Sequence, residues 1–140
     1  MNKDRYIVEA LMRRVESHKA VVGLPIRYIG VSNFLAPTNG KWFECVFIPN
    51  NGRDEYWGDG KTYKGMFRLV LHWPMHNQGI LDAMDKCKEM ADLIPKGSQF
   101  TDVGNNVTVT ITDHPDYSDI LEDENELLVG LTFYYRSFIL

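Results

Sequence analysis

The sequence has few of the features that indicate a secreted or a membrane-spanning protein. Only two of its 140 residues are cysteines, Cys45 and Cys87, and their 42-position separation forms no metal or redox pattern. Its longest apolar stretches are about five residues, whereas a membrane-spanning helix requires about 20. The N-terminus has no apolar run typical of a signal peptide. We therefore expect a reduced, soluble domain that is made inside a cell.

Positive charge is scarce in the C-terminal third. No Lys or Arg occurs from residue 97 to residue 135, and residues 97–140 hold eight acidic residues beside Arg136 alone. Residues 1–96 carry 14 basic and 11 acidic residues. Nucleic-acid binding and docking on an anionic membrane both need clustered Lys and Arg. The net charge of −4 therefore argues against both functions.

The sequence also shows no catalytic constellation. Lys61 and Thr62 end a segment similar to a phosphate-binding loop, but Glu55 replaces the first glycine of that motif. A strand, not a helix, is predicted to follow, so no helix N-terminus is present to bind phosphate. Cys45 and Cys87 lie on apolar stripes, where buried thiols have a raised pKa and are poor nucleophiles.

The histidines also form no recognisable metal-binding pattern. His72 and His76 are four residues apart, but Pro74 lies between them, so they cannot share a helical face as paired zinc ligands do. A metal site completed by Asp82 is an open alternative. The interpretation that we favour is a surface histidine on a strand and a second histidine in a loop.

The periodicity of the apolar residues predicts one α+β domain over residues 1–140. We expect an antiparallel sheet of about five or six strands, with two amphipathic helices packed on one face. The apolar stripe of the second helix includes Met84 and Cys87 and is widened by Leu81. The expected helices span 4–19 and 78–95, and the expected strands span 26–30, 42–48, 63–73, 100–103, 107–112 and 127–138.

Two further segments attract attention. The glycine-rich connection over residues 50–62 holds Tyr56 and Trp57, which either fold back on the domain or meet another molecule. Residues 113–126 hold seven carboxylates, a run typical of a solvated loop. Calcium is a functional alternative because hard cations bind clustered oxygens, but the loop–helix calcium signature is absent. Of the two functional alternatives, we favour an electrostatic surface over a metal site.

Taken in order, the segments resemble the tail terminator proteins of long-tailed bacteriophages. Three local patterns carry the resemblance. The strand over residues 63–71 runs into Trp73-Pro74 and a polar turn before a helix. That helix ends in residues 91–97 and is followed by a short strand pair that ends in residues 107–111. The last strand, residues 127–136, finishes almost at the C-terminus.

The resemblance implies a structural protein of the virion, not an enzyme, and no cofactor or metal. It implies a homohexameric ring on the head-proximal end of the tail tube, which halts tube polymerisation and offers the surface for head joining. The implied partners are other copies of the chain, the tail tube protein, the head–tail connector or neck protein and the tape measure protein. DNA would pass through the ring without specific binding, and the protein would be made in the host cytoplasm.

In such a ring, two unlike patches of one subunit meet, so a basic surface can contact an acidic surface of the neighbour. We expect the acidic residues either to pair with a neighbouring subunit or to line the channel, where they would repel DNA. The candidate interface residues are Arg53, Tyr56, Trp57, Lys61, Asp113, Asp116, Asp119, Glu122 and Asp123. Two alternatives stay open: another neck or head–tail joining component, and a small enzyme or ligand-binding domain.

Overall fold

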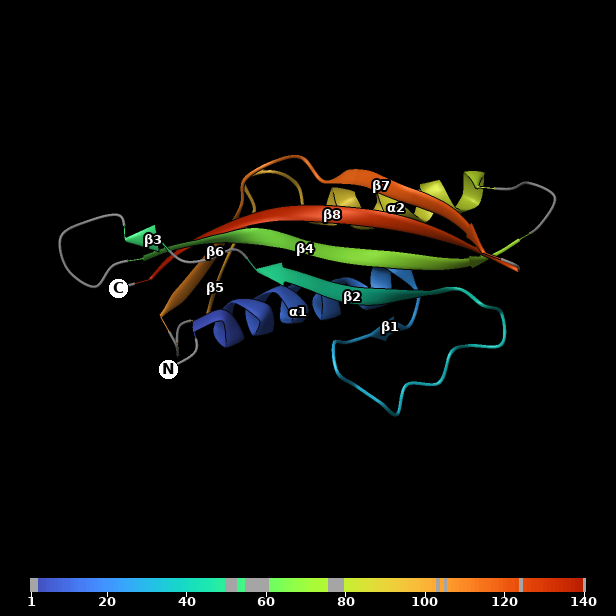
Figure 1. Cartoon of the computed structure of the whole chain (residues 1–140), viewed down its shortest axis with the longest axis horizontal. Helices are drawn as coiled ribbons and strands as arrows, with labels where there is room; N and C mark the ends of the chain where they lie inside the picture. Colours follow the sequence, from blue (N-terminus) through green and yellow to red (C-terminus); the bar gives the residue numbers. More distant parts are fainter. Residues whose placement is uncertain are drawn as a thin grey trace.

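The computed structural model describes residues 3–49, 53–54, 61–75, 80–102, 104, 106–123 and 125–139. It contains two helices and eight strands within these residues (Figure 1). The elements are α1 (Lys3–Val22), β1 (Ile26–Arg27), β2 (Trp42–Pro49), β3 (Arg53–Asp54), β4 (Lys61–Pro74), α2 (Leu81–Leu93), β5 (Gln99–Asp102), β6 (Val107–Ile111), β7 (Asp116–Asp123) and β8 (Glu126–Ile139). The predicted α+β class is therefore confirmed.

The two longest strands, β4 and β8, form the centre of the sheet. They pair antiparallel along their whole length, from Lys61 opposite Ile139 to Pro74 opposite Glu126. The strand order is β1-β2-β4-β8-β6-β5, with β3 added to β4 and β7 added to β8. The predicted antiparallel pairing of residues 42–48 with 63–73 is confirmed. The short strand β1 pairs parallel with β2, so the sheet is mixed.

The core lies between one face of the sheet and the two helices. Successive strand residues point to opposite faces, so the buried residues of β4 and β8 are every second one. Phe67, Leu69 and Leu71 of β4 are at most 1% exposed and lie in register with buried residues of β8. Buried side chains of both helices complete this cluster: Ile7, Ala10, Leu11, Val15, Val22, Ala83, Cys87 and Met90.

The helix ends differ from the prediction by a few residues. α1 extends three residues beyond the predicted end and stops at Gly23, whose φ of 78° is left-handed. The Gly23 N–H donates to the Lys19 carbonyl oxygen at 2.8 Å, which is the hydrogen bond of a left-handed helix C-cap. A residue with a Cβ is strained at this φ, so glycine sets the end of α1.

The acidic run over residues 113–126 is not a solvated loop, and that prediction was wrong. Most of the run forms β7, which pairs antiparallel with β8 from Asp116 opposite Thr132 to Asp123 opposite Glu126. The reason is the edge of β8: β6 pairs with it only at Tyr135 and Arg136. The remaining N–H and C=O groups on that edge require a partner, and β7 supplies it despite its charge.

Candidate functional site

The structure places the two groups of predicted interface residues at opposite ends of the sheet. Arg53 lies opposite Thr62, and Lys61 lies opposite Asp54 and Ile139, at the end near the C-terminus. Tyr56 and Trp57 lie outside the described residues. β7 pairs only with the other half of β8, beside residues 68–74 of β4. Seven strand residues, about 23 Å, separate Lys61 from the nearest row of β7, so these groups do not form one surface.

β7 and the turn before it carry all five predicted acidic residues. Asp113, Asp116 and Glu122 are exposed, while Asp119 and Asp123 are placed by their backbone in the strand. The Tyr134 hydroxyl donates to the Asp116 carboxylate at 3.3 Å. Partial burial and then the nearby Asp116 raise the pKa of Tyr134. Asp113, Asp116 and Glu122 thus lie exposed beside β8.

His72 is not the surface histidine that the sequence pattern predicted. Its side chain is only 12% exposed and lies between two carboxylates on the sheet face away from the helices. The distance from Nδ1 to Glu126 Oε1 is 2.5 Å, and from Nε2 to Glu44 Oε2 it is 3.0 Å. The Trp42 ring stacks on the imidazole, with ring centroids 3.7 Å apart. Strand pairing explains the cluster: Trp42 lies directly opposite His72, and Glu44 and Glu126 lie opposite Val70 and Pro74, two residues away along β4.

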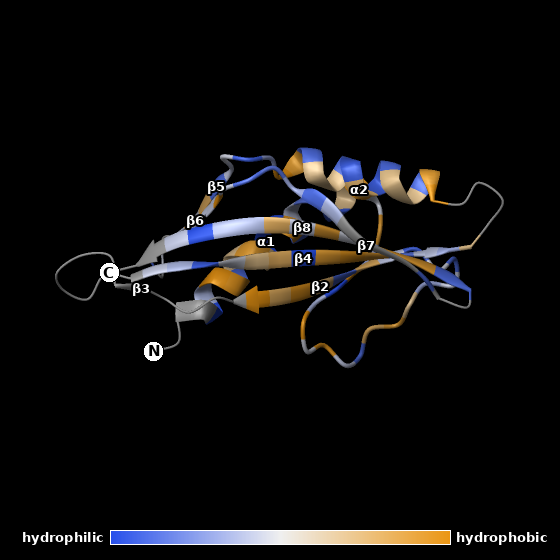
Figure 2. Cartoon of the chain, turned by 45° about the horizontal axis from the view of Figure 1, so that its top comes forward, coloured by the Kyte–Doolittle hydropathy of each residue, from blue (hydrophilic) through white to orange (hydrophobic). Residues whose placement is uncertain are grey.

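The loop over residues 28–41 is a candidate surface that sequence reasoning missed. It joins β1 to β2 and projects beyond the β1–β2 edge of the sheet (Figure 1). No charged residue occurs from residue 28 to residue 40, and Figure 2 shows hydrophobic stretches along the loop. Leu35 is 87% exposed, and Ile29 and Val31 are also exposed. A signal was present in the sequence: a long loop without charge or regular structure is often a binding loop.

The outer side of α2 carries a second exposed apolar patch. Leu81 is 63% exposed and Met84 is 37% exposed, although Met84 was expected to belong to the buried stripe of this helix and Leu81 to widen it. Ala83, Cys87 and Met90 face the sheet instead, which fills the available core. The Tyr117 hydroxyl of β7 donates to the Met84 carbonyl oxygen at 3.4 Å. Leu81, Met84 and Tyr117 therefore form a continuous surface, the α2–β7 patch.

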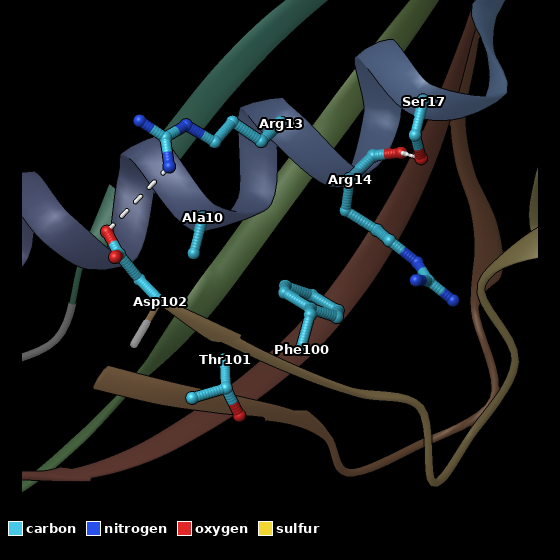
Figure 3. A pocket seen from close by; sticks show the side chains of 7 residues that line it. All are labelled: Ala10, Arg13, Arg14, Ser17, Phe100, Thr101 and Asp102. Atoms are coloured by element: carbon cyan, nitrogen blue, oxygen red, sulfur yellow. Dashed lines mark hydrogen bonds and ion pairs between the residues drawn. The ribbon is translucent and has the colours of Figure 1, made fainter. Parts of the chain in front are cut away.

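A small groove lies between α1 and β5 (Figure 3). It has a volume of about 220 Å³. Arg13 reaches toward Asp102 at 4.0 Å, and the Arg14 guanidinium lies over the Phe100 ring, 5.7 Å from its centroid. These side chains give the groove charge and an aromatic surface. Within the described residues, no three His, Cys, Asp or Glu side chains are placed to hold a metal ion. No described helix has the length and apolar character needed to cross a membrane.

Both cysteines are buried free thiols, as the sequence predicted. Burial raises the pKa of Cys45, with a further contribution from Glu44, and burial raises the pKa of Cys87, each from 9.0 to about 12. The thiolate form is therefore disfavoured in the folded state. The resulting contribution to stability is complete below pH 9.0, where unfolded thiols begin to ionise, and is lost as the pH rises towards 12.

We expect both thiols of the folded protein to resist a maleimide reagent at about pH 8, because the thiolate is the reactive form. In denaturing guanidinium chloride, both should react completely. Mass spectrometry of the labelled chain measures this difference. Rapid labelling of the folded chain at either cysteine would contradict the burial described here.

Comparison with known proteins agrees with the fold. One solved structure is 20% identical in sequence, and its alignment with this protein spans 98% of this chain and 96% of the solved chain, with a TM-score of 0.78. At this identity, the likeness shows the fold alone. No curated protein matches the chain. The family model described as phage tail terminator protein matches residues 6–135, which include both helices and most of the sheet. The chain therefore belongs to the phage tail terminator protein family, whose members are structural proteins of the phage tail.

Proposed function

We propose that this chain forms a homohexameric ring on the head-proximal end of the tail tube, where it ends tube polymerisation and offers the head-joining surface. The observation that carries the proposal is the family match over residues 6–135. The fold is compatible with such a role, because the sheet holds several exposed surfaces on different sides of one small subunit. Function in this proposal depends on the shapes and charges of those surfaces.

The proposed partners follow from this position. One rim of the ring contacts the last ring of the tail tube protein, and the other contacts the head–tail connector or neck protein. The tape measure protein lies within the tube below, and DNA passes through the ring without specific binding. The protein is made in the host cytoplasm and ends in the virion tail.

Deletion of the gene from its phage tests this proposal. Without a terminator, tube subunits have no cap to stop their addition, so we expect overlong tails of variable length in electron micrographs. Expression of the chain from a plasmid should restore uniform tails. Unjoined tails of normal length would instead identify a joining component, and normal virions would show that the chain is dispensable. Either of these outcomes would overturn the proposal.

A further inference from the structure

Two exposed apolar surfaces lie on opposite flanks of the subunit. The first is the 28–41 loop, with Leu35 at 87% exposure, and the second is the α2–β7 patch, with Leu81 at 63% exposure. Both views place the loop beyond the β1–β2 edge and α2 beside β7 and β8, with the long strands between them (Figures 1 and 2). These two surfaces therefore cannot cover each other within one chain.

We propose that the 28–41 loop of one subunit docks on the α2–β7 patch of the next subunit around the ring. This inference rests on the proposed ring and names the surfaces that build it. A ring with one subunit type needs a heterologous contact, in which two different patches of the same chain meet. Apolar patches that are exposed on a free subunit are typical of protein contacts. The occupant of each patch is thus a second copy of this chain.

The charges of the two flanks favour this pairing. Both ends of the loop are basic: Arg27, which pairs with Glu44 at 3.0 Å, precedes the loop and Lys41 closes it, while residues 28–40 carry no charge. The opposite flank, taken as residues 81–93 and 113–123, carries nine acidic and two basic residues. The two basic residues there already pair with carboxylates of α2: Lys86 with Glu89 at 3.2 Å and Lys88 with Asp92 at 3.0 Å. The basic end of the loop and the acidic flank attract each other, while two acidic flanks repel, which favours head-to-tail contact.

The loop is held in place before docking. Phe34 of the loop packs on Trp42, with ring centroids 5.0 Å apart, and Trp42 stacks on His72. Inside the loop, the Gly40 N–H donates to the Pro37 carbonyl oxygen at 3.0 Å. These contacts hold one side of the loop against the sheet and leave Leu35 exposed. A surface ordered in advance loses less conformational entropy on binding.

Cross-linking in assembled tails tests the contact. The chain with Leu35→Cys and Leu81→Cys is supplied to the deletion phage, and purified tails are treated with a short bismaleimide. We expect a ladder of cross-linked subunits on a denaturing gel, because every subunit offers one thiol to each neighbour. Each single variant should stay monomeric, since its one new thiol meets no second thiol. The native Cys45 and Cys87 are buried and should not contribute.

The pair Ile48→Cys and Leu81→Cys is the matched control. Ile48 is exposed but lies six strand residues, about 20 Å, from the loop end of β2, so no ladder is expected. If the Leu35 and Leu81 pair blocks assembly, Ile29→Cys with Met84→Cys replaces it. Tails of normal length without a ladder overturn the inference and leave tube termination intact. Dimers from a single variant also overturn it, because they indicate an isologous contact.

A charge test at Leu35 gives a second readout. Leu35→Asp places a carboxylate against the acidic flank, so we expect the overlong tails of the deletion. Leu35→Lys, of comparable polarity, should preserve more tails of normal length, because its charge is opposite to that of the flank. Circular dichroism of both purified variants checks that the fold is retained. Equal tail-length defects in the two variants would overturn the charge pairing.

Discussion

Replacement of Phe67 by alanine is expected to lower the free energy of unfolding by about 3–5 kcal/mol. Phe67 is 1% exposed and lies at the middle of the sheet, in register with Phe47 of β2 and Phe133 of β8. Loss of its ring removes buried apolar area and leaves a cavity between the sheet and the helices. Since a domain of this kind is stable by about 5–15 kcal/mol, much of the stability is lost.

Urea denaturation followed by circular dichroism measures this change. Phe67→Leu is the first control, because it leaves a smaller cavity and should cost less. Met66→Ala is the second control: Met66 is the preceding residue, points to the other face and is only partly buried. A cost for Met66→Ala equal to that of Phe67→Ala would contradict the assignment of the core to the helix-covered face.

The second large effect is expected at Gly65, the fifth residue of β4. A Cβ at this position would lie 2.6 Å from the Ile48 carbonyl oxygen and 2.6 Å from the Tyr135 hydroxyl oxygen. Tyr135 is buried and pairs with Gly65 across the β4–β8 ladder. Gly65→Ala must therefore displace either backbone or a fully packed ring. We expect a loss of about 2–3 kcal/mol, near the upper end of the usual cost of overpacking.

A double-mutant cycle with Tyr135→Phe tests the cause. The phenylalanine lacks the hydroxyl oxygen that the new Cβ would meet, while the Ile48 carbonyl oxygen remains. We expect the double variant to be more stable than the sum of the single effects predicts, by about 0.5 kcal/mol or more. Simple additivity would show that the Tyr135 hydroxyl is not responsible. Gly104→Ala serves as a control, because the nearest atom to a Cβ added there is Asp102 Oδ1 at 3.5 Å, an ordinary van der Waals contact.

Phe67 and Gly65 both lie on β4, which forms the centre of the sheet together with β8 and supports the proposed function through it. β4 and β8 run together over 14 paired residues and carry the remaining strands on their two sides. The loop over residues 28–41 is attached through β2, and β7 is attached through β8. A stable centre thus fixes the separation of the two flanks that meet in the proposed ring, so changes at Phe67 or Gly65 should weaken assembly as well as folding.

Local periodicity determined most of the elements. The alternation over residues 63–73 and 127–138 predicted the two central strands because one face of each is buried and the other is not. The three- and four-residue spacing of Ile7, Leu11 and Val15 predicted α1 for the same reason, and all three are buried. The burial of both thiols also followed from their apolar neighbours. In these cases, side-chain pattern and tertiary environment agree.

Tertiary pairing decided what the pattern could not. Residues 116–123 became a strand because β8 has an open edge, and an edge left open by a distant element is invisible in the local sequence. His72 is enclosed because strand pairing brings Glu44 and Glu126, 28 and 54 positions away, to the rows of Val70 and Pro74, on either side of His72 along β4.

The candidate interface was likewise determined partly by the sequence and partly by the tertiary structure. The sequence by itself determined an α+β domain with an uneven distribution of charge, because composition and periodicity are properties of the chain. Only the tertiary structure decided which apolar side chains remain outside: the core against α2 is filled by Ala83, Cys87 and Met90, so Leu81 and Met84 stay exposed. It also brought α2 beside β7 and set both apart from the 28–41 loop. The physical reason is that a core has limited volume, and strand pairing determines which segments surround it.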